Sequence, residues 1–235
     1  MPPDGPRLIR SVLTPTLEAI RQFDTCQIAN AIETLGLRLR NVGFTRPGLQ
    51  PLAGASLSAL GFAVTTRFRA ADPPVAGKIY PDRTDWWEYV ASAPSPRIAI
   101  FEELENPPGT GAAVGEVHGE ILRALGCAGL LTNGSVRDLP ALRAMRFPVF
   151  AQSTSVSHAY IHLVDFAQPV EILGLAIAPG DLIYADCHGA ISIPLEAAPE
   201  LPAIALEQAK RERRVIDLCR SGKFTVEALR LEVNR

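Results

Sequence analysis

The chain has 235 residues, of which 47% are hydrophobic, and its formal net charge at pH 7 is −2. This length and composition can bury one sizeable core. The near-neutral charge and a pI near 6.1 provide no basic surface for a nucleic acid. No apolar run reaches the length of a membrane-spanning helix. Because Met1–Arg10 also lacks an apolar signal segment, we expect a cytoplasmic protein.

Hydrophobic periodicity predicts helices and strands that alternate in the middle of the chain, with more strands towards its end. The predicted helices are 15–23, 25–35, 85–91, 115–125, 139–145, 195–220 and 225–231. The predicted strands are 61–68, 98–102, 129–132, 149–151, 170–173, 182–185 and 190–193. This order predicts an α/β fold with a central mixed sheet and flanking helices.

The segment 70–87 is longer than a usual connection and contains paired prolines and an Asp-Trp-Trp run. Two interpretations are open. The segment can form a lid or an interface loop, or Trp86 and Trp87 can begin a packed helix.

The most informative motif lies between residues 115 and 138. Gly115-Glu116-Val117-His118 opens a predicted helix that Gly126 ends, and the next predicted strand runs into a turn at Asn133-Gly134. We expect this strand to bring Arg137 and Asp138 to a loop beside the first turn of the helix.

The motif supplies the N–H groups of a helix N-terminus, a guanidinium and two carboxylates. Together these groups can bind a small carboxylate ligand through a hard divalent metal. Plainer interpretations are also open. Arg137 and Asp138 can be a surface ion pair in which Asp138 is the N-cap of the following helix. Glu116 can simply complement the dipole of its helix.

Several segments resemble the RraA-like family, which includes the class II 4-hydroxy-4-methyl-2-oxoglutarate/4-carboxy-4-hydroxy-2-oxoadipate aldolases. The segments are 25–36, 115–138, 142–151 and 169–189. The resemblance implies one RraA-like domain over residues 1–235, with a core at about 20–195 and a C-terminal helical segment at 196–235. It also implies a β/β/α swivelling-type fold, and a homotrimer or hexamer with its site at the subunit interface.

The resemblance further implies a metal-dependent enzyme that cleaves 4-hydroxy-2-oxo acids to release pyruvate, or that decarboxylates oxaloacetate through the same enolate chemistry. The family's acid-x20-Arg-Asp pattern corresponds here to Glu116, Arg137 and Asp138. Asp138 is then the ligand of Mg²⁺ or Mn²⁺. Arg137 and Glu116 are the expected catalytic residues, Arg137 at the developing oxyanion and Glu116 facing the ion through a water. The expected substrate-binding residues are Gly115, Glu116, Val117, His118 and Arg137.

Three positions depart from the family pattern. The first acid is more often Asp in the aldolases, and Glu116 reaches about one methylene further. Asn133 replaces a common Asp, which removes a charge but keeps a residue that suits a turn. His118 stands where Leu is frequent, and a titratable ring beside the ligand can change specificity.

A function of another class is also open, namely a non-enzymatic regulator that binds a protein, as the ribonuclease E inhibitors of this family do. Proteins of that branch tend to lack the first acid of the pattern, so Glu116 favours an enzyme. A methyltransferase, a label attached to some similar sequences, has no support because no glycine-rich nucleotide loop follows an early strand.

The remaining metal-ligating and nucleophilic residues give weaker signals. The four cysteines are far apart, which favours reduced thiols. Cys187 is predicted to be a small semi-buried thiol without a paired base. His188 follows Asp186 in a tight turn, which predicts a structural hydrogen bond. His158 and His162 are four residues apart, but their surroundings favour a loop or strand over the helix that a zincin site needs.

Overall fold

The computed structural model describes residues 14–53, 57–74 and 84–234. The described residues divide into two compact units, one within Asn41–Leu195 and the other within 1–40 and 196–235. The prediction of a single domain stays a prediction. Part of the predicted 70–87 loop, at 75–83, lies outside the described residues, as does Met1–Arg10. None of the described helices is long and apolar enough to cross a membrane.

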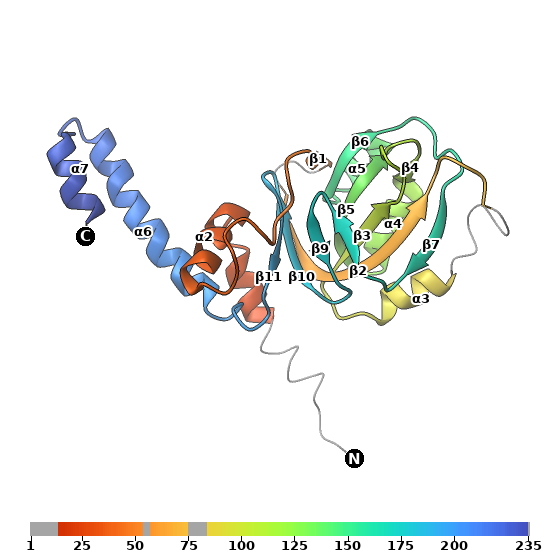
Figure 1. Ribbon diagram of the computed structural model, residues 1–235, viewed down its shortest axis with the longest axis horizontal. Helices are drawn as coiled ribbons and strands as arrows, with labels where there is room; N and C mark the ends of the chain where they lie inside the picture. Colours follow the sequence, from red (N-terminus) through yellow and green to blue (C-terminus); the bar gives the residue numbers. More distant parts are fainter. Residues whose placement is uncertain (1–13, 54–56, 75–83, 235) are drawn as a thin grey trace, which may run out of the picture. The chain divides into compact units, whose positions relative to one another are not determined.

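The larger unit is built on a nine-stranded mixed sheet with the order β1-β6-β5-β3-β2-β10-β11, in which β4 also pairs with β5 and β7 with β2 (Figure 1). The strands are β1 (Gln50–Ala53), β2 (Ala59–Arg69), β3 (Arg97–Glu103), β4 (Ala112–Val114), β5 (Cys127–Val136), β6 (Val149–Thr154), β7 (His162–Phe166), β10 (Leu182–Asp186) and β11 (Gly189–Ile193). β2, β3, β5 and β6 run parallel, and so do β4 and β5. The remaining pairings are antiparallel.

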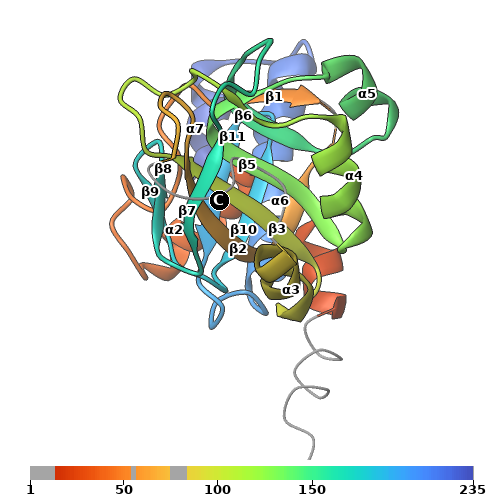
Figure 2. The same ribbon diagram turned by 90° about the vertical axis from the view of Figure 1, so that its right-hand side faces the viewer.

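Helices cover one face of the sheet and a hairpin covers the other (Figure 2). The helices are α3 (Thr84–Ser92), α4 (Glu116–Ala124) and α5 (Leu139–Ala144), and the hairpin is formed by β8 (Val170–Ile172) and β9 (Leu175–Ile177). Successive side chains of β3 point to opposite faces of the sheet. Ala99 and Phe101 belong to the core under the helices, and Ile98 and Ile100 belong to the core under the hairpin. The predicted mixed α/β fold with flanking helices is therefore confirmed.

The tryptophans belong to a packed helix, which decides between the two interpretations of residues 85–87. Trp86 in α3 is fully buried. Its ring packs edge-on against Phe101 with the ring centroids 5.5 Å apart. Aromatic burial of this kind fixes α3 against the sheet.

The smaller unit is helical. It contains residues 14–20 as a helix, followed by α2 (Thr25–Leu35), α6 (Leu201–Arg220) and α7 (Val226–Val233). A capping box begins α2, because the Asp24 carboxylate accepts from the Gln27 N–H at 2.8 Å and the Gln27 side chain accepts from the Asp24 N–H at 3.0 Å. Gly36 ends α2 in the left-handed conformation, with φ of 64°.

The predicted turn at Asn133-Gly134 is wrong, because β5 continues through these residues to Val136. The Asn133 amide pairs with the backbone of Glu103 in β3: its Oδ1 accepts from the Glu103 N–H at 2.7 Å, and its Nδ2 donates to the Glu103 carbonyl at 3.0 Å. At Gly134 a Cβ would overlap the Glu103 carboxylate. The β5–β6 register shifts between Thr132 and Ser135, so the Asn-Gly pair forms an irregularity within the strand.

Candidate functional site

Two neighbouring strand-to-helix junctions bring the predicted site together. Val114 at the end of β4 pairs in parallel with Val136 at the end of β5. The Arg137 N–H donates to the Val114 carbonyl at 3.0 Å, which joins the two junctions directly. Because parallel strands end at the same edge of a sheet, the start of α4 lies beside the loop that carries Arg137 and Asp138.

The Asp138 carboxylate points at the first turn of α4. Its Oδ2 accepts a hydrogen bond from the Glu116 N–H at 3.0 Å and lies 3.6 Å from the Arg137 Nε. At Gly115 a Cβ would overlap Asp138 Oδ2 and lie 3.1 Å from the Arg137 Cγ. Glycine is therefore the residue that leaves room for this carboxylate at the N-terminus of α4.

Asp138 is the N-cap residue of α5 by position, but its side chain makes no capping bond there. Its backbone is in the left-handed region, with φ of 55° and ψ of 37°, a conformation that Asp tolerates better than most residues. The N-cap position is as that interpretation has it, but the Asp138 carboxylate accepts from the first turn of α4 and makes no capping bond to α5. The ion pair with Arg137 is present, with side chains 37% and 42% exposed. An ion pair this exposed contributes little stability, so stability does not account for the arrangement.

All the predicted site residues line one cavity of about 460 Å³. They are Gly115, Glu116, Val117, His118, Arg137 and Asp138. Trp87, Ile121 and Ile161 add apolar walls. A cavity of this size, largely apolar with a few convergent polar groups, is typical of small-molecule sites. The roles of the individual residues stay predictions.

His118 is held neutral inside the protein. Its side chain is buried and hydrogen-bonds the Ala113 backbone, and its ring packs edge-on against Phe101 with centroids 6.1 Å apart. Burial lowers the pKa of His118 to about 4. The imidazole is uncharged at pH 7, so this ring adds no positive charge to the cavity.

Sequence reasoning missed the apolar walls, and it weighed His158 only as a possible metal ligand with His162, whereas the structure places His158 in the wall of the cavity. His158 Nδ1 lies 2.8 Å from the Ala159 carbonyl, and because a carbonyl only accepts, Nδ1 is the donor. His162 lies in β7, where its Nδ1 contacts the Tyr160 carbonyl at 2.9 Å. The two histidines share no helix, in agreement with the rejection of a zincin site.

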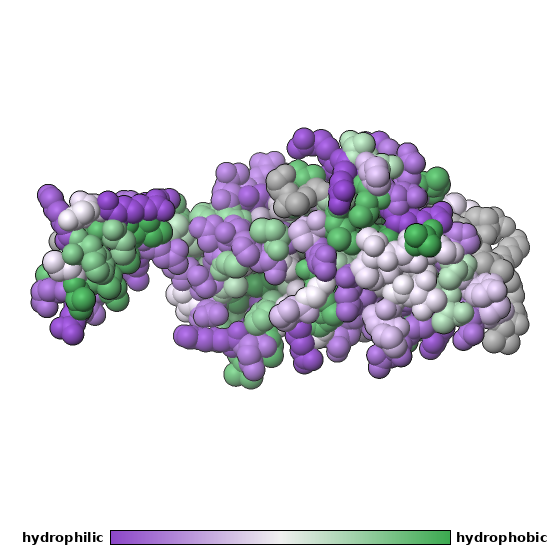
Figure 3. Space-filling view, turned by 90° about the horizontal axis from the view of Figure 1, so that it is seen from above, coloured by the Kyte–Doolittle hydropathy of each residue, from purple (hydrophilic) through white to green (hydrophobic). Residues whose placement is uncertain are grey.

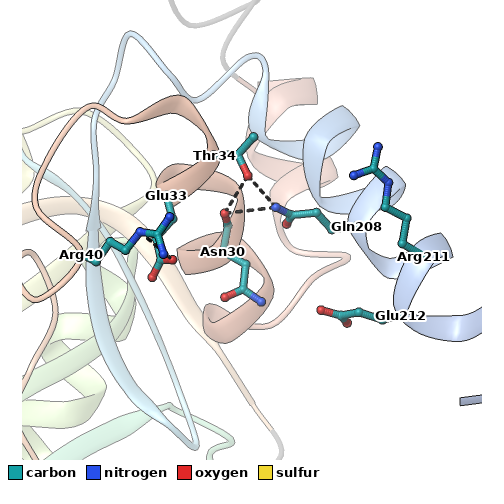
Figure 4. A pocket seen from close by; sticks show the side chains of 7 residues that line it. All are labelled: Asn30, Glu33, Thr34, Arg40, Gln208, Arg211 and Glu212. Atoms are coloured by element: carbon teal, nitrogen blue, oxygen red, sulfur yellow. Dashed lines mark hydrogen bonds and ion pairs between the residues drawn. The ribbon is translucent and has the colours of Figure 1, made fainter. Parts of the chain in front are cut away.

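The helical unit has a smaller hollow of about 340 Å³ between α2 and α6 (Figure 4). Several of its polar groups bind one another. Gln208 Nε2 donates to the Asn30 carbonyl at 3.2 Å and to the Thr34 hydroxyl at 2.7 Å, while Arg40 pairs with Glu33 at 3.7 Å. None of the predicted site residues lies there.

Comparison with known proteins identifies the family. Residues 25–192 match the RraA-like family, described as Aldolase/RraA, and the chain belongs to this family.

Two curated relatives match the chain over part of their length. An uncharacterized protein from Methanocaldococcus jannaschii is 31% identical over 108 residues, which are 46% of this chain and 52% of that protein. A proposed 4-hydroxy-4-methyl-2-oxoglutarate aldolase from Halalkalibacterium halodurans is 33% identical over 86 residues, which are 36% of this chain and 41% of that protein. The chain thus spans about half or less of each relative.

Solved structures share the fold over most of the chain. A protein from Pseudomonas syringae superposes with a TM-score of 0.72 at 23% identity, over 93% of both chains. An unusual member of the RNase ES inhibitor RraA family from Streptomyces coelicolor gives a TM-score of 0.65 at 21% identity, over 91% of this chain and 96% of that one. At these identities the comparisons show the fold alone.

Proposed function

We propose that this protein is a divalent-metal-dependent lyase that cleaves 4-hydroxy-2-oxo acids and releases pyruvate. The observation that supports this function best is the convergence of Asp138, Arg137 and Glu116 on one cavity at the N-terminus of α4. Membership of a family described as Aldolase/RraA, and the relative named as a proposed aldolase, support the same reaction class.

The donor set of this site fits a hard cation. Asp138 offers a half-exposed carboxylate whose Oδ2 is engaged by the Glu116 N–H and by Arg137, and within the described part of the chain no group bonds its Oδ1. Glu116 adds a second carboxylate to the cavity wall. Mg²⁺ and Mn²⁺ favour few carboxylates and several waters. We assign Asp138 Oδ1 to the ion, which when bound supplies positive charge beside the 2-oxo group.

The other groups bind and polarise the substrate. The Glu116 N–H already donates to Asp138, and the next first-turn amides of α4, those of Val117 and His118, provide N–H groups at the positive end of the helix. Such groups suit the carboxylate of a 2-oxo acid. Arg137 has a planar guanidinium that can bind an oxyanion through two N–H groups. The C4 hydroxyl of the substrate passes its proton through a water to the Glu116 carboxylate. The C3–C4 bond then breaks, its electrons pass to the pyruvate enolate, and C4 becomes a carbonyl. Arg137 stabilises the charge that develops.

Glu116 has the remaining role. The enolate carbon C3 must take up a proton before pyruvate leaves, and the exposed Glu116, which has accepted the C4 hydroxyl proton, can return a proton to C3 through a water. Decarboxylation of oxaloacetate releases CO2 and yields the same enolate, and its C3 proton then comes from solvent through the carboxylic acid form of Glu116. We therefore propose oxaloacetate decarboxylation as a second activity of this site.

The decisive experiment is a substrate panel. Purified protein is incubated with Mg²⁺ or Mn²⁺ and a series of 4-hydroxy-2-oxo acids, with oxaloacetate included, and pyruvate release is coupled to a dehydrogenase. We expect metal-dependent release from at least one compound. Absence of release from every compound, together with absence of methyl-proton exchange in pyruvate, would favour the protein-binding regulator.

The proposed enzyme is a homotrimer or hexamer. Large apolar side chains are exposed in the C-terminal helical segment, where Figure 3 shows apolar atoms gathered over α6 and α7. These residues are Ile216, Phe224, Val226, Leu231 and Val233. Exposed apolar surface of this kind favours self-association. Light scattering during size-exclusion chromatography tests the number of subunits.

A further inference from the structure

The turn between β10 and β11 gathers three metal-ligating side chains. Asp186 and Gly189 form the last pair of the two strands, which leaves Cys187 and His188 as a two-residue loop. One ligand atom from each of Asp186, Cys187 and His188 lies within 4.8 Å of the others. Throughout the described ranges, no other group of three or more His, Cys, Asp or Glu side chains meets this condition.

This arrangement corrects the sequence prediction for Cys187. The thiol is exposed, not semi-buried, and its Sγ lies 3.6 Å from the Nδ1 of His188. The predicted hydrogen bond of His188 is present, since its Nδ1 lies 3.1 Å from the Asp186 Oδ1.

Two of these separations are close to the edges of a zinc coordination tetrahedron. With Zn–S of about 2.3 Å and Zn–N and Zn–O of about 2.0 Å, the N···O edge is about 3.3 Å and the S···N edge about 3.5 Å. The structure has 3.1 Å between Nδ1 and Oδ1, and 3.6 Å between Sγ and Nδ1. The Cys187 Sγ also lies 3.9 Å from His188 Nε2, so the imidazole ring must rotate to point Nδ1 at an ion shared with the thiolate. All three ligand atoms already lie within 4.8 Å of one another, so rotation of exposed side chains can place them on one ion.

The turn is held in place before any ion binds. Asp186 Oδ1 accepts from the His188 N–H at 2.8 Å, and its side chain is only 10% exposed. Gly189 has φ of 132°, and a Cβ there would lie 2.7 Å from the Thr45 hydroxyl, which itself accepts from the Ala190 N–H at 3.0 Å. A pre-formed turn reduces the entropy that binding must overcome. Cys187 and His188 face solvent, so an ion can enter.

We propose that Asp186, Cys187 and His188 bind one Zn²⁺ through a carboxylate oxygen, the thiolate and Nδ1, with water in the fourth position. The thiol proton passes to solvent, and the imidazole proton moves from Nδ1 to Nε2. Thiolate and imidazole ligands select zinc-class ions over Mg²⁺. This site is therefore separate from the one at Asp138.

Cobalt provides the test, because a thiolate bound to Co²⁺ gives a charge-transfer absorption band. The full-length protein is reduced, stripped with EDTA and titrated with Co²⁺. We expect the band to saturate at one equivalent and to disappear when equimolar Zn²⁺ is added. A hundredfold excess of Mg²⁺ should leave it unchanged. Absence of the band at any Co²⁺ concentration overturns the proposal.

Variants assign the ligands. Cys187→Ser should abolish the band, whereas Cys219→Ser, which alters another exposed cysteine, should retain it. Asp186→Asn keeps an oxygen that can accept from the His188 N–H but removes the charge, and it should weaken Zn²⁺ binding at least about tenfold, as should His188→Asn. A band that persists in Cys187→Ser overturns the assignment.

Alkylation provides a readout that does not depend on cobalt. Zn²⁺ should slow the alkylation of Cys187 about tenfold, measured by mass spectrometry, and leave Cys26 and Cys219 unaffected, because a metal-bound thiolate reacts more slowly. Equal protection of all three cysteines contradicts a specific site. The Asp138→Ala variant should keep both signals, so failure here is distinguishable from failure of the proposed lyase.

Discussion

Two aspartates at strand ends show how neighbours decide the chemistry of a carboxylate. Asp138 follows β5, is 42% exposed, and lies beside a backbone N–H and a guanidinium. Asp186 ends β10, is 10% exposed, and lies beside a thiol and an imidazole. The first environment favours a hard ion with an anionic substrate, and the second favours a softer metal. Residue type alone does not separate the two.

The two sites also differ in how the chain assembles them. The Asp138 site needs two strand-to-helix junctions, with Gly115 and Asp138 brought together by the pairing of β4 with β5. The Asp186 site consists of three consecutive residues in one hairpin turn. The first therefore depends on the tertiary structure, and the second is largely local.

The largest expected effect is the loss of activity in Asp138→Ala. Because Asp138 is the proposed metal ligand, turnover should fall by roughly two or more orders of magnitude. Steady-state pyruvate release measures this, with Asp217→Ala on exposed α6 as the matched control. The Asp138→Ala variant should keep the cobalt band of the Asp186 site. Asp186→Asn should instead keep pyruvate release and bind metal more weakly at the Asp186 site. Undiminished turnover, or full activity in excess EDTA, contradicts the metal role.

Glu116→Gln should have the next largest effect. Without a carboxylate to deliver the proton, exchange of the pyruvate methyl protons should slow about 100-fold, at the lower end of the range for general acid–base catalysis. NMR in D₂O follows this exchange. The control is Glu120→Gln, one turn along the same helix, where the side chain pairs with Arg123. Pyruvate binding should stay nearly intact in both variants. Equal exchange rates in the two would leave Glu116 as a partner of the helix dipole only.

Arg137→Lys should cost less, about tenfold in kcat, because the charge remains while the planar pair of donors is lost. The fold should be preserved, since the ion pair with Asp138 is exposed. Arg123→Lys on the outer face of α4 is the matched control. If the kinetics of Arg137→Lys are close to those of the wild type, Arg137 acts only as the ion-pair partner of Asp138 and has no role in catalysis.

How far the sequence predicts the fold depends on the length of each element. The long helices and the strands at 61–68, 98–102 and 182–185 correspond to α2, α6, β2, β3 and β10, because each has a clear apolar period. The predicted helix 195–220 starts later, at Leu201. Four short strands, β1, β4, β7 and β9, are missing from the prediction, because segments of three to five residues show little of an apolar period. β8 is equally short but is covered by the predicted strand 170–173.

The site was predictable where it depends on a motif and unpredictable where it depends on packing. Glu116, Arg137 and Asp138 were found from their spacing, and the structure brings them to one cavity. Trp87 and Ile161 come from α3 and from the segment before β7, and no spacing in the sequence connects them with residues 115–138. The burial of His118 was equally hidden, because it follows from contacts with β3.

The smallest expected effect is on stability and comes from His118. The unfolded chain protonates His118 below about pH 6.5, but the folded protein keeps it neutral down to about pH 4. Above pH 6.5 this histidine contributes no pH dependence. As pH falls from 6.5 to 4, the unfolded state gains protons that the folded state does not, and the free energy of unfolding decreases by about 3 kcal/mol from this group. The acid side of the stability curve therefore contains a contribution from the α4 junction.

His118→Leu removes that contribution. At pH 7.5 the variant should be slightly less stable, by about 1 kcal/mol, since the Ala113 carbonyl loses its donor. Between pH 6.5 and 4 its free energy of unfolding should then decline less steeply than that of the wild type. Urea unfolding at a series of pH values measures both curves. If the two curves stay parallel over this range, His118 takes up its proton in the folded protein over the same pH range as in the unfolded chain, and the cavity gains a positive charge as pH falls below about 6.5.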